Sequence, residues 1–125
     1  MDGRKQAIFA YIVLSENDIH PSGVSNTVSG DNYMFLYKIN RNTHTMRIYD
    51  IMTDSVINGR ISLMYDSHTY SYLKIIKRDG HYFCYDSFSN TYAAGIFYNE
   101  IVKIFDYQSN KFYVFRQISV EPETL

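Results

Sequence analysis

Residues 74–85 read KIIKRDGHYFCY, and this stretch decides the fold class. The Asp79-Gly80 pair favours the left-handed backbone conformations that a two-residue hairpin turn requires. On both sides of it lie the aromatic and β-branched residues that suit a pleated, half-buried surface. The stretch therefore predicts an antiparallel β-hairpin.

Three more hairpins are predicted from turn residues that separate similar apolar runs. Asn58-Gly59 is a second tight-turn pair, and the other two turns are built from residues whose side chains bond to the nearby backbone, at 40–43 and 108–110. Consecutive hairpins predict an antiparallel meander. The expected strands lie at 33–39, 44–51, 53–57, 60–66, 69–78, 81–87, 100–107 and 111–118.

The predicted fold is mainly β, with about seven or eight antiparallel strands that form a curled sheet or small barrel. The apolar run near the N-terminus, at 6–14, suits either a helix or a strand. As a helix packed on the sheet it would make the fold α+β, the alternative class. The best helical candidates are Arg4–Leu14 and 90–102, because alanine is otherwise scarce.

Alternating residues in two strands predict which face of the sheet is buried. In the C-terminal strand, Phe112, Val114 and Ile118 are expected to face the core. Tyr113, which lies at an alternate position, is expected to face outward. In the strand at 60–66, Leu63 and the residues that alternate with it are expected to form the buried, apolar face.

The length of 125 residues fits one domain, expected to span 1–119. The polar segment 15–32 lacks a hydrophobic period and is predicted to be a long loop, with a binding or lid role as one interpretation. The acidic, proline-containing tail 120–125 is predicted to be flexible.

The charge and cysteine content narrow the class of partner and the compartment. Twelve basic and 13 acidic residues give a net charge of −1, and the interspersed signs make nucleic acid an unlikely partner. The single cysteine, Cys84, excludes an intramolecular disulfide and paired-cysteine metal motifs and favours a reducing compartment. Without a run of about 20 apolar residues, no membrane span is predicted, and a cytoplasmic location is expected, in a host cell if the protein is viral.

Candidate chemistry is weak at every position considered. His81 and Cys84 lie three apart, so on a regular strand they point to opposite faces and cannot form a nucleophile–base pair. Four aspartates follow an aromatic residue at a strand end; they could form acid–base pairs across a cleft, but aspartate is also a good turn residue. These are Asp50, Asp66, Asp86 and Asp106. We predict no catalytic residue, no metal site and no cofactor.

The positive signal is an excess of aromatic side chains, with 13 tyrosines, eight phenylalanines and no tryptophan. Tyrosine offers a large, rigid contact area and a hydroxyl, which suits protein interfaces, although it is also a strong strand former. The predicted interface consists of Tyr70, Tyr72, Lys74 and Tyr113, with His20 from the polar segment.

The favoured hypothesis is a small non-enzymatic protein-binding module, such as a virus- or phage-type inhibitor of a host factor or a subunit of an assembly. Frequent Ile, Tyr, Asn, Asp and Ser with little Ala motivate the viral or phage origin. Homodimerisation through an edge strand is a further expectation. The alternatives are a β-barrel for a small or nucleotide-like ligand, and an enzyme whose site is assembled only in three dimensions.

Overall fold

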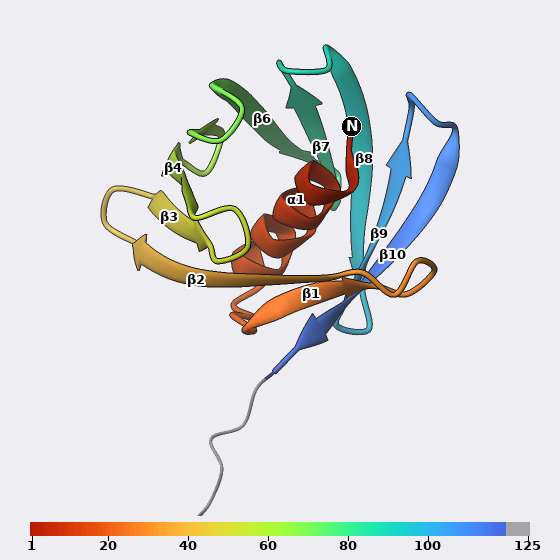
Figure 1. Cartoon of the computed structure of the whole chain (residues 1–125), viewed down its shortest axis with the longest axis horizontal. Helices are drawn as coiled ribbons and strands as arrows, with labels where there is room; N and C mark the ends of the chain where they lie inside the picture. Colours follow the sequence, from red (N-terminus) through yellow and green to blue (C-terminus); the bar gives the residue numbers. More distant parts are fainter. Residues whose placement is uncertain (120–125) are drawn as a thin grey trace, which may run out of the picture.

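The computed structural model describes residues 1–119 and shows one helix enclosed by a closed antiparallel barrel (Figure 1). The helix is α1 (Gly3–Glu16), and each strand pairs with the next along the chain until β10 returns to pair with β1. The predicted class is confirmed, with ten strands in place of seven or eight. The strands are β1 (Gly23–Asn26), β2 (Asn32–Asn40), β3 (Thr45–Asp50), β4 (Ser55–Arg60), β5 (Leu63–Asp66), β6 (Ser71–Arg78), β7 (His81–Asp86), β8 (Thr91–Tyr98), β9 (Ile101–Asp106) and β10 (Lys111–Ile118).

Three predicted elements were wrong. The polar segment 15–32 contains β1, which closes the barrel by pairing with β10 and β2. The helical candidate at 90–102 is β8 and the start of β9. Asn58-Gly59 lies inside β4, and the turn to β5 follows Arg60; Gly59 has φ +149 and an added Cβ would lie 2.5 Å from the Leu63 carbonyl oxygen.

Helix α1 fills the interior of the barrel (Figure 1). Asp2 caps its N-terminus, because the Asp2 side chain accepts a hydrogen bond of 2.8 Å from the Lys5 backbone N–H. All side chains from Ala7 to Leu14 are fully buried, which explains why the helix is apolar on every face instead of amphipathic. The N-terminal element, for which the sequence allowed either a helix or a strand, is thus a helix inside the barrel.

Small residues on β8 make room for α1. A Cβ added at Gly95 would lie 3.0 Å from the Phe9 ring, and Ala93, two residues earlier on the same inward face, is buried. Ala93 and Gly95, which lie in the stretch predicted as a helix at 90–102, are therefore interior positions of a strand that a helix approaches closely.

The face predictions for β5 and β10 were reversed. Met64 is fully buried while Leu63 is exposed, and Phe115 is buried while Phe112 is 60% exposed. Alternation identifies two faces but not which one is inside. In this barrel α1 occupies the interior, and several large aromatic side chains, Phe83 and Phe112 among them, lie on the outside.

Every strand in residues 1–119 is paired on both sides, so the described chain offers no free edge for the predicted strand-addition homodimer. Within the same residues, no helix has the length and apolar character needed to cross a membrane. The predicted flexible tail, 120–125, lies outside the described residues.

Candidate functional site

The four aspartates that follow aromatic residues converge at one end of the barrel, and we call them the aspartate ring. Asp50, Asp66, Asp86 and Asp106 end β3, β5, β7 and β9, and all four are buried. Each accepts a hydrogen bond of 2.9–3.0 Å from the backbone N–H two residues later, which builds an Asx turn. Sequence reasoning recognised these aspartates as turn residues but not that they meet.

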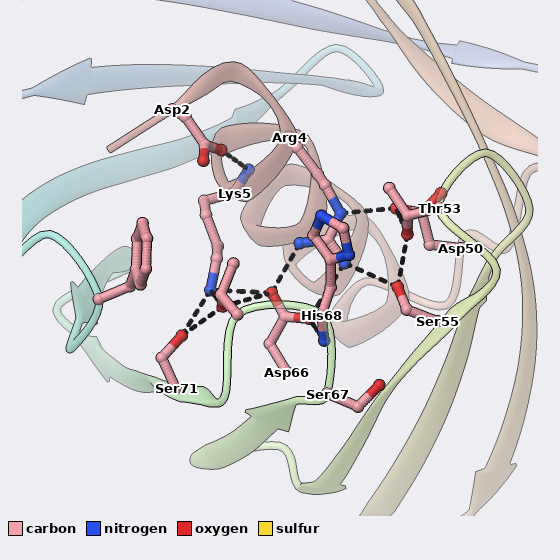
Figure 2. Close-up of polar contacts among 12 residues, drawn as sticks. Asp2, Arg4, Lys5, Asp50, Thr53, Ser55, Asp66, Ser67, His68 and Ser71 are labelled. Carbon is pink, nitrogen blue, oxygen red and sulfur yellow. Dashed lines mark hydrogen bonds and ion pairs between the residues drawn. The ribbon is translucent and has the colours of Figure 1, made fainter.

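Two cations at the start of α1, Arg4 and Lys5, pair with the aspartate ring, and Figure 2 shows their contacts with Asp50 and Asp66. Arg4 donates to Asp50 through Nε at 2.6 Å and to both carboxylate oxygens of Asp66 at 2.6 and 3.0 Å. Lys5 is fully buried, with Nζ 2.8 Å from Asp66 and 3.7 Å from Asp86. At Asp106, Gln6 donates to the carboxylate at 2.8 Å.

This network keeps the Asp66 carboxylate ionised. Burial alone would raise the pKa of the Asp66 carboxyl, but its hydrogen bonds with Arg4 and Lys5 hold that pKa well below its usual range. An acid–base pair needs two carboxyl groups whose pKa values are pushed apart so that one is protonated. The aspartate ring therefore fastens α1 to the barrel.

The histidines and the cysteine do not assemble a catalytic site. His44 pairs with Glu16 at the other end of the barrel, His68 lies in the β5–β6 turn, and His81 starts β7 on the outside. Cys84 is buried inside, where burial raises the pKa of its thiol and keeps it protonated. Residues 1–119 hold no group of three or more His, Cys, Asp or Glu side chains arranged to bind a metal ion.

Within residues 1–119, α1 occupies the interior that a ligand-binding barrel, one of the alternatives, would leave open. Such a barrel needs an enclosed cavity among its inward side chains. Here the inward side chains of the strands pack against α1, and the two form a single core. Any binding surface on the described chain has to be sought on the outside.

The five predicted interface residues are not brought together. Tyr72 and Lys74 face outward on β6, and Tyr70 is 82% exposed in the preceding turn. Tyr113 points inward, packs against the core and donates to the Ser109 hydroxyl at 3.2 Å. His20 is half-buried and stacks on Tyr37, with ring centroids 4.6 Å apart, far along the barrel wall from β6.

The outward-facing side chains of β1–β10, which we call the outer wall, have an unbalanced charge. Because the strand aspartates all point inward, the wall within residues 1–119 carries seven Lys or Arg side chains and no carboxylate. In the described chain none of the seven forms an ion pair. These cations are Lys38, Arg47, Arg60, Lys74, Arg78, Lys103 and Arg116.

One half of the outer wall carries a continuous row of apolar side chains, which we call the apolar patch. The register places them side by side on β6 to β10, so that each is the direct cross-strand neighbour of the next. Next to the row lies an open hollow of about 490 Å³ that includes Ile96 and Lys103. The apolar patch consists of Ile76, Phe83, Ala94, Phe105 and Phe112.

The sequence contained signals for the aspartate ring and for the apolar patch, but neither signal could be interpreted from the sequence alone. Phe112 was predicted to face the core, because strand alternation does not reveal which face is inside. The recurring aromatic-Asp pairs pointed to the aspartate ring only if Arg4 and Lys5 were known to begin an enclosed helix.

Comparisons of this chain with family models, with curated proteins and with solved structures found no match. Neither a family nor a related fold therefore assigns an activity. The surface of the barrel itself, with its apolar patch and its unpaired cations, is what indicates a function.

Proposed function

We propose that this chain is a non-enzymatic protein-binding module and that its partner docks on the apolar patch. The observation that carries the proposal is the exposure of this row: Phe112 is 60% exposed, Ile76 48% and Phe83 37%. A contiguous apolar surface of this kind is uncommon on monomeric proteins and is typical of interaction sites.

The chemistry around the apolar patch specifies the partner. Lys74 and His81 border the row, and the Lys103 ammonium lies 4.5 Å from the centre of the Phe112 ring. The wall carries no carboxylate in residues 1–119 to balance these cations. A partner with an apolar centre and carboxylates around it matches both features. An inhibitor of a host factor or a subunit of an assembly would use such a surface.

Affinity capture from a lysate of the native host tests the proposal with three versions of the tagged chain. The patch variant Phe83→Ser/Phe112→Ser removes two outward rings without touching the interior. The matched control, Leu36→Ser/Met52→Ser, removes two exposed apolar side chains elsewhere. Aromatic anchors at interface centres contribute about 2 kcal/mol or more, roughly thirtyfold in affinity.

A partner held by the wild type and the control but lost by the patch variant supports the proposal. A partner retained equally by all three chains, each shown to be folded by its thermal melting curve, contradicts it. Size-exclusion chromatography of the purified chain completes the test, because self-association that the patch variant loses would identify the partner as a second copy.

A further inference from the structure

A second part of the outer wall, which adjoins the apolar patch at Lys74, combines cations with stacked tyrosines. One cross-strand row runs Lys38, Arg47, Asn58, Tyr65 and Tyr72 from β2 to β6. The adjacent row, two residues further along the strands, runs Arg60, Leu63, Lys74, Tyr85 and Tyr92 from β4 to β8. We call the two rows together the cation–tyrosine stripe.

The cations of the stripe form no ion pair within the described chain that would stabilise the fold. Lys38 and Arg47 are direct cross-strand partners, and Arg60 lies diagonal to Arg47 on the same face. Like charges placed opposite one another on a sheet destabilise it. No carboxylate in the described chain pairs with any of them. An unpaired cluster of this kind fits a polyanion that neutralises it on binding.

The tyrosines of the stripe are arranged as stacking surfaces. Tyr65 and Tyr72 have ring centroids 5.1 Å apart, and Tyr85 and Tyr92 have centroids 4.9 Å apart, each pair tilted and spanning two strands. Tyr72 and Tyr92 are exposed. Each row holds cations and a tyrosine pair, and cations together with aromatic faces are the combination by which proteins hold single-stranded nucleic acid without sequence preference.

The outer surface is also hollowed at both ends of the stripe. A depression of about 160 Å³ is lined by Lys38, Arg47 and Tyr49, and one of about 380 Å³ is lined by Lys74, Tyr85 and Tyr92. Each row crosses five strands, roughly 19 Å at the usual strand spacing. That length accommodates about five nucleotides at the ~3.4 Å rise of one strand in a duplex.

We propose that the cation–tyrosine stripe binds single-stranded nucleic acid, with phosphates on Lys38, Arg47, Arg60 and Lys74 and bases stacked on the tyrosines. The overall charge of −1 argued against such a partner at the level of sequence. In the structure four of the 13 carboxylates are buried in the aspartate ring, whereas two of the 12 basic residues, Arg4 and Lys5, pair with them there, so the rest of the chain carries slightly more basic than acidic side chains.

The test uses the full chain and a fluorescein-labelled oligothymidylate of about 20 nucleotides, long enough for one binding site. Fluorescence anisotropy is measured from low salt upward, starting at about 0.05 M. Four neutralised phosphates predict a slope of log K against log salt of about −3, since each contributes about −0.7 on a single strand.

Matched variants separate the two contributions of the stripe. Arg47→Ala should make the slope shallower by about 0.7, and Tyr72→Ala should weaken binding about tenfold and leave the slope unchanged. The controls remove similar side chains from the wall outside the stripe: Arg116→Ala on β10 and Tyr98→Ala on β8. Both should retain wild-type affinity.

Three outcomes would overturn the proposal. These are no binding at low salt, equal losses in control and stripe variants, or competition by poly-glutamate as strong as by unlabelled oligothymidylate. The last result would reveal an acidic-protein site in place of a stacking surface. The residues of the apolar patch are unchanged in all four variants, so a failure here leaves the proposed protein-binding function untouched.

Discussion

Tyr70 has a backbone conformation that its side chain disfavours. It sits at φ 52 in the β5–β6 turn, four residues after Asp66. The equivalent positions after the other three ring aspartates are Asp54, Asn90 and Asn110, also at positive φ, and asparagine and aspartate tolerate this region best. An exposed tyrosine is thus held where a smaller polar residue would suit the fold better.

Replacing Tyr70 by asparagine should stabilise the protein. The left-handed conformation costs roughly 1–2 kcal/mol for a residue with a bulky side chain, so Tyr70→Asn should raise the free energy of unfolding by about 1 kcal/mol. The reverse change at the matched turn, Asn110→Tyr, should lower it by a similar amount. Urea denaturation of both variants checks the pair, and a loss of stability in Tyr70→Asn would contradict the explanation.

At the scale of elements, α1 depends on the buried ammonium of Lys5. Lys5→Met keeps most of the side-chain volume but leaves Asp86 without a cation in its buried site. Breaking one partner of a buried ion pair costs about 3–5 kcal/mol, because the other charge remains uncompensated. Lys74→Met, which removes an unpaired cation from the outer wall, should change stability by no more than about 0.5 kcal/mol.

A double variant identifies the cause of that loss. Asp86→Asn removes the uncompensated charge and keeps an oxygen for the bond to the Phe88 backbone N–H. Adding it to Lys5→Met should therefore recover part of the lost stability, as measured by urea denaturation. If the double variant loses as much free energy of unfolding as the two single variants combined, or more, the loss comes from packing around α1 and not from charge.

Sequence reasoning identified most of the strands and turns but assigned several side chains to the wrong face of the sheet. Asp79-Gly80 forms the predicted turn, with both residues at positive φ, because that preference is local. The inward position of Tyr113 and the strand at Ala93 depend on an enclosed helix, which no local pattern reveals. The basic and acidic residues can be counted in the sequence, but the separation of the outer-wall cations from the carboxylates emerges only when the barrel closes.

At the scale of the whole molecule, stability should depend on pH in two steps. Burial, followed by the nearby Arg41 charge, lowers the pKa of His20, so the neutral form is favoured in the fold and a shallow loss begins as pH falls through the histidine range. The pKa of Asp66 is also lowered, so its contribution is present above about pH 4, the unfolded value, and is lost progressively below it.

The free energy of unfolding measured between pH 7 and pH 3 should therefore fall gently at first and steeply below about pH 4. Asp66→Asn should be less stable at neutral pH and show a flatter profile under acid, because the group that titrates is gone. His20→Gln should remove the shallow step alone. A steep fall that Asp66→Asn leaves unchanged would assign acid sensitivity to another carboxylate.

The enclosure of α1 also dictates the order in which the chain folds. A finished barrel cannot admit a helix whose first turn carries two cations matched to one end, so the strands have to wrap around α1 as they pair. The seam joins Gly23–Asn26 to 115–118, which lie at opposite ends of the described chain. The seam therefore joins parts of the chain that are far apart in sequence, and pairing of such distant strands is intrinsically slow.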